Sequence, residues 1–422
     1  MSALKGLSEL NRLEVRYQQL TVGQLRWYER ALYFEYDETF LTKGLWLSPF
    51  NLPLKSETFK HEDLSFGPLF GLFEDSLPDG WGRLLMSRHF KQRGLSLRGS
   101  TPLAPLAYLG DKTMGALTYH PPRGEERGTE ELRLAPLARH AQEVISGEVS
   151  EVLPELRRAG GSPGGARPKV LVGVLREGCE GLPLISGEGG LPLSHAPWLV
   201  KFRGPEDDRD AAAVELSYMT LARRAGLEVP QVRAFEAEGE LYFGVERFDR
   251  RLSEGGWRRV HLHTLGGLLQ ADFRVPSCDY EDLLKVTRAL THNDLAALEQ
   301  ALRLMLFNWL SHNRDDHVKN VSFLMGDEGQ WRLAPAYDLT WSAGPSGEHS
   351  MTISGEGRAP KLAHVFKLCE AFKVSQKRAQ ELITEVSEAL SHWSMVSAEW
   401  GVTSETQARV QAVMNQVWRD RA

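Results

Sequence analysis

The spacing of apolar residues divides the chain into a strand-rich first half and a helical second half. Short apolar stretches with aromatic, leucine and β-branched residues predict strands at 24–34, 45–54, 170–175, 198–202, 231–237 and 241–247. Apolar positions at helical spacing predict helices at 81–90, 211–225, 280–291, 294–311, 361–393 and 403–420. The change of character falls near residue 248, where the two halves are expected to join.

Stretches rich in Gly, Pro and polar residues mark the boundaries within these halves. Residues 121–131 predict a linker, and the Gly-rich stretch 159–165 predicts a loop that leads into the strand at 170. A hairpin is expected at 321–333, followed by a long loop at 342–360. The predicted parts are a β-rich N-terminal subdomain at 1–120, an α/β part with the Gly-rich loop at 121–248, and a helical part at 249–422.

Composition places the chain among ordinary globular proteins. Of its 422 residues, 42% are hydrophobic and 25% are charged, which excludes wholesale disorder and low-complexity architectures. The net charge of -6 argues against a general nucleic-acid coat. No apolar stretch approaches the roughly 20 residues that span a bilayer, and no secretion signal precedes residue 20, so a cytoplasmic protein without membrane contact is expected. The three cysteines are expected to be reduced thiols; they are Cys179, Cys278 and Cys369.

The segment most informative about chemistry runs from residue 308 to residue 320. Its Asp315 and Asn320 have the D-x-x-x-x-N spacing of a phosphotransferase catalytic loop. In that chemistry a carboxylate orients the attacking hydroxyl and takes its proton, while an amide oxygen helps to hold Mg²⁺ on the phosphates. Asp338 follows Asn320 by 18 residues, after the expected hairpin, where a metal-binding aspartate is expected. The alternative interpretation is a solvated loop after a helix.

Two features nearer the N-terminus bear on this hypothesis. A phosphotransferase needs a lysine on a strand to meet the nucleotide phosphates, and usually a helix carboxylate to fix that lysine. Lys201 lies in an apolar strand, and Glu215 lies on the helix that follows. The Gly-rich loop at 160–169 predicts a flexible cover, because glycines let backbone N–H groups approach phosphate. The alternatives are an edge-strand lysine and a plain linker.

Five stretches of the chain resemble the HipA-type serine/threonine kinases, the toxins of bacterial toxin–antitoxin pairs. In order along the chain they are 73–79 (FEDSLPD), 161–169 (GSPGGARPK), 245–250 (VERFDR), 313–320 (NRDDHVKN) and 334–338 (APAYD). The resemblance extends over nearly the whole chain, from about Val22 to the C-terminal helices. It implies an α+β, two-lobed protein-kinase-like fold with an added small N-terminal subdomain and an all-helical C-terminal lobe. The N-lobe would then be 121–248 and the C-lobe 249–422.

The resemblance assigns roles around the catalytic loop. Asp315 corresponds to the catalytic aspartate, and Asn320 and Asp338 correspond to the Mg²⁺ ligands. Lys201 corresponds to the lysine that contacts the nucleotide phosphates. His317 is assigned to the same nucleotide site, as a structural hydrogen-bonding residue rather than a proton carrier.

Two further residues match the hinge that receives adenine in such kinases. Glu246 would offer a backbone edge for hydrogen bonds, and Phe248 an aromatic ring for stacking. The alternatives are that Glu246 pairs with Arg247 or Arg250 on the surface and that Phe248 is an ordinary core residue.

The Gly-rich loop carries the other assigned ATP-binding residues, which are Ser162, Gly164, Gly165 and Lys169. Ser162 matches the serine that HipA-type kinases phosphorylate on themselves, and Lys169 matches the basic residue that closes the loop. Pro163 biases Ser162 toward extended backbone, which either holds the serine in an accessible turn or alters how the loop moves.

The resemblance implies a growth-arresting protein kinase that uses ATP and Mg²⁺. Its substrate would be a cytosolic protein, and members of the family modify aminoacyl-tRNA synthetases. Its partner would be a small helix-turn-helix antitoxin that supplies most of the DNA contact, and phosphorylation of Ser162 would inhibit the kinase itself. Two other functions stay open, a kinase-shaped regulator that binds its partner with little transfer activity, and a small-molecule kinase.

Overall fold

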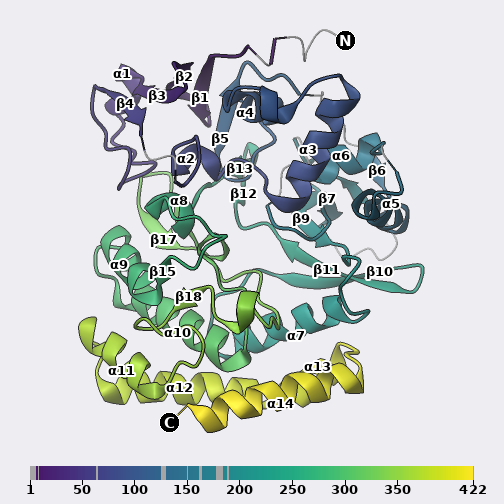
Figure 1. Ribbon diagram of the computed structural model, residues 1–422, viewed down its shortest axis with the longest axis vertical. Helices are drawn as coiled ribbons and strands as arrows, with labels where there is room; N and C mark the ends of the chain where they lie inside the picture. The colour runs from purple at the N-terminus through teal and green to yellow at the C-terminus, as the bar shows by residue number, and fades with distance from the viewer. Residues whose placement is uncertain are drawn as a thin grey trace.

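A five-stranded antiparallel sheet forms the N-terminal part of the computed structural model (Figure 1). The structure describes residues 6–7, 9–62, 65–124, 130–149, 151–160, 164–176, 184–187 and 190–421. The sheet has the order β4-β3-β2-β1-β5, with β1 (Arg12–Tyr17), β2 (Leu20–Tyr28), β3 (Ala31–Tyr36), β4 (Thr58–His61) and β5 (Leu117–His120). Glu29 and Arg30 join β2 to β3 with φ angles of 48° and 62°, the geometry of a turn that matches the strand twist.

Short helices lie beside this first sheet, and one of them reaches the next part of the fold. They are α1 (Glu38–Leu41), α2 (Gly71–Glu74), α3 (Gly80–Gln92) and α4 (Leu103–Leu109), with a 3₁₀ turn η1 (Leu97–Gly99). The helix predicted at 81–90 is therefore confirmed as α3. Its Trp81 and Leu85 are buried in the core of the second sheet rather than the first. This helix joins the N-terminal part firmly to the part that follows.

The second sheet has six antiparallel strands and contains the strands predicted near 170, 198, 231 and 241. Its order is β10-β11-β9-β7-β8-β6, with β6 (Glu131–Leu132), β7 (Lys169–Leu175), β8 (Leu184–Ser186), β9 (His195–Lys201), β10 (Val232–Ala237) and β11 (Glu240–Glu246). The helices of this part are α5 (Leu134–Ser146), α6 (Pro154–Gly160) and α7 (Ala211–Arg224). Helix α7 packs against β11 on one side and against the C-terminal helices on the other.

The C-terminal part is helical apart from short strands, so the expected all-helical lobe is correct for its large elements only. Its helices are α8 (Leu265–Leu269), α9 (Tyr280–Leu290), α10 (Leu295–Ser311), α11 (Leu362–Ala371), α12 (Gln376–Ser391), α13 (Trp393–Glu399) and α14 (Ser404–Asp420). Helices α11–α14 form the layer at the bottom of Figure 1. The strands are β12 (Arg250–Ser253), β13 (Gly256–Arg259), β14 (His261–Thr264), β15 (Cys278–Asp279), β16 (Ser322–Met325), β17 (Trp331–Leu333) and β18 (Met351–Thr352), with 3₁₀ turns η2 (Val318–Asn320) and η3 (Pro345–Gly347).

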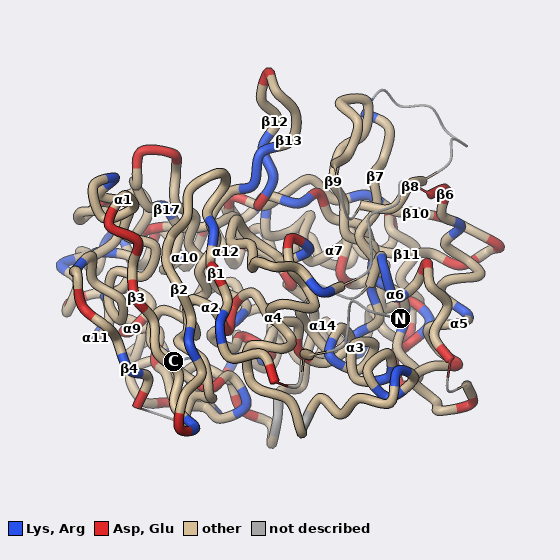
Figure 2. Tube along the Cα trace, turned by 90° about the horizontal axis from the view of Figure 1, so that it is seen from above, with Lys and Arg blue, Asp and Glu red and all other residues tan. Residues whose placement is uncertain are grey.

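Two sequence predictions were wrong for physical reasons that the structure supplies. Residues 45–54 form turns, not a strand, because Leu47 and Leu52 are buried in the core without a neighbouring strand to pair with among the described residues. The single helix predicted at 361–393 is two helices, since Lys373 has a φ of 60° and Ser375 caps the start of α12. The hairpin β12–β13, which stands out from the body in Figure 2, was not predicted.

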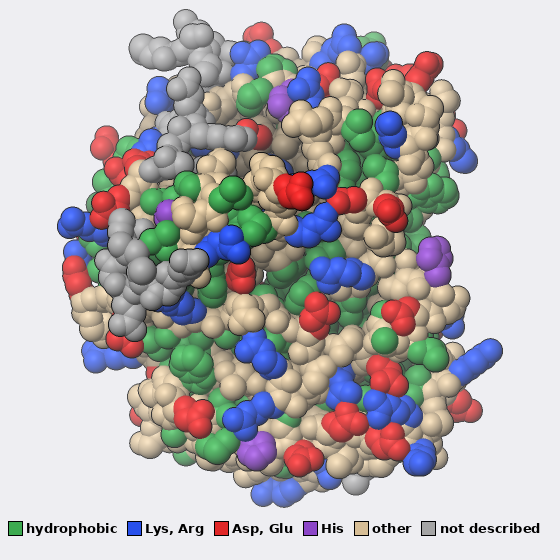
Figure 3. Space-filling view, turned by 180° about the vertical axis from the view of Figure 1, so that it is seen from behind, with side chains coloured by type: hydrophobic (Ala, Val, Ile, Leu, Met, Phe, Trp, Pro, Cys, Tyr) green, Lys and Arg blue, Asp and Glu red, His purple; other side chains and the backbone are tan. Residues whose placement is uncertain are grey.

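The surface carries both signs of charge. On the face seen in Figure 3, Lys and Arg side chains are interspersed with Asp and Glu side chains, and no single-sign patch covers the described part of that face. None of the described helices has the length and apolar character needed to cross a membrane.

Candidate active site

Lys201 is held between two carboxylates that come from different parts of the chain. It ends β9, and its Nζ lies 2.6 Å from Glu215 Oε1 of α7. The same Nζ also donates to Asp338 Oδ1, from the segment after β17. Burial by itself lowers the pKa of Lys201, but Asp338 and Glu215 outweigh it and raise that pKa above its ordinary value. The lysine is therefore charged, and the expected pairing of Lys201 with Glu215 is present.

Asp338 lies at the point where the predicted hairpin returns to the site. Its backbone is left-handed, with a φ of 57°, a conformation that non-glycine residues adopt mainly at functional or strained positions. Burial raises the pKa of its carboxyl, but Lys201 and Lys169 outweigh that effect and hold the pKa well below its usual range. The side chain stays ionised and is 30% exposed, so part of the carboxylate remains open to a ligand.

The catalytic-loop residues follow the C-terminus of α10. His312 ends this helix in the left-handed conformation with a φ of 60°, which turns the chain toward Asp315. The Asp315 side chain is 53% exposed, and its Oδ1 lies 3.9 Å from His317 Nε2. Asn320 Nδ2 donates to the backbone oxygen of Asp315 at 2.8 Å, which leaves the amide oxygen of Asn320 free for a ligand.

The neighbouring carboxylate, Asp316, is buried and anchors the loop, and no role beside that of Asp315 was predicted for it from the sequence. Asp316 is 2% exposed and accepts hydrogen bonds from Tyr280 at 2.8 Å, His349 at 2.9 Å and the backbone N–H of Ser350 at 2.8 Å. A carboxylate that is buried and bonded to three donors is shielded from solvent and committed to holding the loop. The two adjacent aspartates thus divide between anchoring the loop and facing solvent.

His317 has the structural position that was favoured for it. It precedes η2, its Nδ1 accepts the backbone N–H of Lys319 at 3.3 Å, and its ring lies 5.2 Å from that of Phe273. These contacts fix the turn that carries Asn320.

The expected hinge segment lies between the two halves of the chain. Glu246 ends β11, and its N–H donates to Gln231 O at 2.9 Å. Arg247 and Arg250, the alternative partners of Glu246, both pair with Asp249 at 2.8 Å, and among the described residues neither forms an ion pair with Glu246. The Phe248 ring lies 5.4 Å from the Tyr337 ring, directly beside Asp338 in sequence, and is only partly buried. Phe248 is therefore near the site and not in the hydrophobic core.

The described end of the Gly-rich loop lies close to these residues, whereas Ser162 lies outside the described residues. Lys169 begins β7 opposite Lys201 of β9, and its Nζ donates to Gly164 O at 2.5 Å. Burial, followed by the charge of Lys201, lowers the pKa of Lys169 to about 8. Gly165 has a φ of 93°, a backbone conformation that side-chain-bearing residues rarely adopt, so the loop favours glycine at this position.

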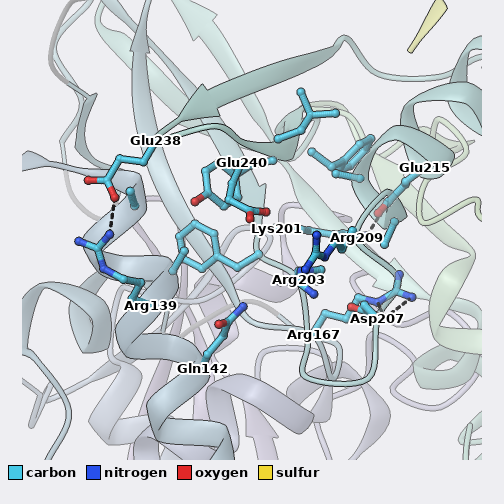
Figure 4. Close-up of a pocket in the computed structure, with 18 residues that line it drawn as sticks. Arg139, Gln142, Arg167, Lys201, Arg203, Asp207, Arg209, Glu215, Glu238 and Glu240 are labelled. Atoms are coloured by element: carbon cyan, nitrogen blue, oxygen red, sulfur yellow. Dashed lines mark hydrogen bonds and ion pairs between the residues drawn. The ribbon is translucent and has the colours of Figure 1, made fainter. Parts of the chain in front are cut away.

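A cavity of about 240 Å³ opens beside Lys201, between α5, α7 and the β10–β11 hairpin. Figure 4 shows the pairs Lys201–Glu215, Arg167–Asp207 and Arg139–Glu238 at its wall. In each pair a carboxylate balances the cation, so the wall of the cavity carries both signs of charge in nearly equal number.

The donor atoms that remain free suit a magnesium ion. Asp338 and Asn320 offer carboxylate and amide oxygens, the hard ligands that Mg²⁺ prefers, and Mg²⁺ commonly takes only one or two protein ligands beside substrate phosphates and water. Within the described residues no three His, Cys, Asp or Glu side chains form a cluster that could hold a metal without a substrate. The residues thus fit a metal bound together with a nucleotide.

Two aspartates of the segment 73–79 were quoted in the resemblance without a role. Asp75 accepts hydrogen bonds from His263 Nδ1 at 2.6 Å and from the N–H and hydroxyl of Thr264, both at 2.7 Å. Asp79 contacts Gly165 of the Gly-rich loop and Lys319 of the catalytic loop. Nothing in local sequence spacing connects residues so far apart, so only the motif itself signalled their importance.

Comparisons with known proteins agree with this architecture. The family described as "HipA-like C-terminal domain" matches residues 161–393, and "HipA N-terminal domain" matches residues 13–120. The protein Y4mE of Sinorhizobium fredii is 28% identical over 308 residues, which are 68% of this chain and 67% of that protein. The "Serine/threonine-protein kinase toxin HipA" of Shewanella oneidensis is 27% identical over 365 residues, which are 80% of this chain and 76% of that protein.

A solved structure extends the likeness to the whole fold. It is the Shewanella oneidensis HipA in complex with HipB and operator DNA, which superposes with a TM-score of 0.69 at 21% identity and covers 96% of this chain and 95% of its own. The expected two-lobed fold with an N-terminal addition is thus confirmed. Because the C-terminal family alone spans more than half of the sequence, the chain belongs to the HipA family of kinase toxins.

Proposed function

We propose that this protein is an ATP- and Mg²⁺-dependent serine/threonine protein kinase and the toxin of a toxin–antitoxin pair. The observation that carries the proposal is the position of Lys201, which contacts Glu215 of its own lobe and Asp338 of the other. Protein kinases bring the same three groups together at the site of phosphoryl transfer, namely a strand lysine, the helix carboxylate that pairs with it and an aspartate that binds the metal.

The residues of the chain divide the work of transfer among them. The exposed carboxylate of Asp315 orients the hydroxyl of the substrate and accepts its proton, as the new O–P bond forms and the bond from the γ-phosphorus to the bridging oxygen breaks with ADP as the leaving group. Lys201 binds the phosphates, with Glu215 keeping its ammonium group directed toward them. Asn320 and Asp338 would hold Mg²⁺, which when bound neutralises charge on the phosphates.

The hinge and the Gly-rich loop complete the nucleotide site in this proposal. The Glu246 N–H already donates to Gln231 O, so the backbone carbonyl of Glu246 and the ring of Phe248 bind adenine. Gly164 presents its backbone N–H group to the phosphates, and Gly165, whose N–H donates to Asp79, gives the loop its left-handed turn. Lys169 closes the loop on Gly164. Ser162 is the proposed site of autophosphorylation, and its modification would switch the kinase off.

The protein substrate and the partner follow from the family. We infer a cytosolic protein substrate, with an aminoacyl-tRNA synthetase as the candidate, in a cytoplasmic setting. A helix-turn-helix antitoxin would bind this chain and connect it to DNA. The proposal of that partner is supported by the similarity of the fold to that of HipA in a complex with HipB and operator DNA.

Transfer from γ-labelled ATP to protein tests the proposal. Wild type should label protein with Mg²⁺ and lose labelling with EDTA. Asp338→Asn should lower turnover by about 100-fold or more, because one charged metal ligand is removed. Asp327→Asn is the matched control, since Asp327 is a surface residue that pairs with arginines outside the site. Equal turnover in Asp338→Asn and wild type would refute the assigned role, and a wild type that binds ATP without transfer would support the regulator instead.

A further inference from the structure

We propose that Asp79, in the N-terminal part, is a positioning residue that holds the Gly-rich loop in place and connects it to the catalytic loop through Lys319. This inference rests on the proposed kinase function and adds a residue from outside the two lobes to that site. It explains why residues 78–81 lie against the loop rather than at the surface of their own subdomain.

The Asp79 carboxylate faces away from its own helix. Asp79 is the N-cap residue of α3, a position where an aspartate ordinarily accepts a backbone N–H of the first turn. Within the described residues it makes no such capping bond, and its Oδ1 instead accepts the backbone N–H of Gly165. Its Oδ2 lies 3.5 Å from Lys319 Nζ. Asp79 therefore bonds to the Gly-rich loop instead of capping α3. This choice of partner indicates that the residue serves the loop rather than the stability of its own helix.

Backbone contacts fix the same part of the loop. The N–H of Trp81 donates to Gly165 O at 3.0 Å, so Gly165 is held by both its N–H and its carbonyl. Gly80 makes this approach possible, because a Cβ there would lie 2.6 Å from Ala166 Cα and 2.7 Å from Gly165 O. The Pro-Asp-Gly-Trp turn and the loop therefore fit against each other at backbone distance.

Trp81 supports the loop at both of its ends. The indole Nε1 donates to Lys169 O at 3.0 Å, where β7 begins. A Cβ at Gly160, where α6 ends, would lie 2.9 Å from the same Nε1. Trp81 is 1% exposed, so it is a rigid base under the loop and not a surface contact.

Lys319 extends these contacts into the catalytic loop. It precedes the metal-ligand candidate Asn320, and the side chains of Lys319 and Asp79 are only 15% and 14% exposed. The Tyr337 hydroxyl donates to Lys319 O at 2.6 Å, next to Asp338. One carboxylate of the N-terminal part thus contacts the segment expected over the phosphates and the segment expected to hold the metal. Loss of this carboxylate should loosen both segments without removing any group that touches the substrate.

A series of variants separates the two contacts of Asp79. Asp79→Ala removes both contacts. Asp79→Asn keeps an oxygen for the N–H of Gly165 and removes the charge that faces Lys319. Lys319→Met removes the ion pair together with the contact of the Lys319 ammonium over the Phe273 ring, and it leaves the bond from Gly165 to Asp79. The matched control is Asp294→Ala, which removes an exposed N-cap aspartate from α10 and its 2.9 Å bond to Ala296 N, far from the loop in sequence.

Two readouts are needed, one of them independent of transfer. We expect Asp79→Ala to raise KM for ATP about tenfold with a smaller change in kcat, and to speed amide hydrogen exchange at residues 164–169 by a similar factor. Asp79→Asn and Lys319→Met should give equal, intermediate changes in exchange. Asp294→Ala should leave both readouts as in wild type while its unfolding midpoint falls.

The outcomes distinguish this inference from the proposed function. If Asp79→Ala keeps the KM and the exchange rates of wild type, the positioning role is wrong even with an active kinase. If wild type fails to bind a non-hydrolysable ATP analogue with Mg²⁺, the kinase function is wrong, and exchange at residues 164–169 alone decides whether Asp79 holds the loop. A third outcome is that Asp79→Ala and Asp294→Ala lower the unfolding midpoint equally and leave amide exchange in the loop unchanged. Asp79 would then act only as a helix cap.

Discussion

Replacement of Asp249, beside the hinge, by asparagine should lower the stability of the folded protein strongly while it hardly changes the shape of the side chain. Its side chain is 2% exposed and pairs at 2.8 Å with Arg247, which is 4% exposed, and with Arg250, which is 14% exposed. It also accepts the N–H of Gly115, from the loop before β5, at 2.8 Å. Asp249→Asn keeps the volume and one acceptor oxygen but leaves two buried guanidinium groups without a countercharge.

The magnitude follows from burial. Removing one partner of a buried ion pair typically costs about 3–5 kcal/mol, because the remaining charge stays desolvated. At an m-value of about 3 kcal/mol/M this is a decrease of roughly 1–1.7 M in the urea midpoint. Asp327 provides the control, since it also pairs with two arginines, Arg251 and Arg258, but all three side chains are 42–57% exposed. Asp327→Asn should cost no more than about 1 kcal/mol.

Urea unfolding followed by circular dichroism, at a series of pH values, measures both variants. Burial raises the pKa of Asp249, but Arg247 and Arg250 outweigh it and hold the pKa well below its usual range. A carboxyl with a lowered folded pKa stabilises fully above its unfolded pKa of about 4, and that stability is lost as the pH falls further. The difference between wild type and Asp249→Asn should therefore be constant near pH 7 and shrink below about pH 4. Equal losses in Asp249→Asn and Asp327→Asn would refute the reasoning from burial.

Three further predictions concern the proposed kinase. Expression of the wild-type chain alone should slow bacterial growth while Asp315→Gln should not; equal arrest, read from growth curves, would indicate binding rather than catalysis. Mass spectrometry after incubation with Mg²⁺-ATP should find phosphate on Ser162 in wild type and none in Asp315→Gln. Titration should then show that the modified form binds ATP more weakly. An unmodified Ser162 or an unchanged ATP affinity would refute self-inhibition. Burial lowers the pKa of Lys169 from 10.5 to about 8, so between pH 8 and pH 10.5 the unfolded chain binds more protons than the folded chain. The free energy of unfolding should therefore rise with pH over this range in wild type but not in Lys169→Met.

The candidate site residues that lie close together along the chain could be predicted from the sequence. Residues 315 and 320 lie on one turn, and the hairpin between Asn320 and Asp338 brings the chain back, so the C-terminal half of the site followed from local structure. The pairing of Lys201 with Glu215 was expected from the lysine–carboxylate pair of ordinary kinases, and it links the end of β9 to α7 across residues 202–210. The functional roles of these residues remain predictions.

Contacts between distant segments could not be predicted in the same way. The division between exposed Asp315 and buried Asp316 depends on Tyr280 and His349, which come from other elements. The leucines at 45–54 suggested a strand because burial, not strand pairing, selects apolar residues there. The position of Asp79 depends on the packing of α3 against the core of the second sheet, to which Trp81 and Leu85 contribute buried side chains and Leu84 a partly buried one.

The close packing of α2 on α8 has a consequence for motion. A Cβ at Gly71 of α2 would lie 1.9 Å from Gly267 O of α8, so the N-terminal part meets the C-terminal helices at backbone distance. The same N-terminal part holds the second sheet through α3. Because the N-terminal part packs against both lobes, it restricts their rotation about the hinge. Two-lobed enzymes usually open and close by such a rotation when they admit a ligand. If the protein binds a nucleotide as proposed, nucleotide exchange should therefore proceed with the lobes nearly stationary and require release of the contacts by which Asp79 and Trp81 hold the Gly-rich loop.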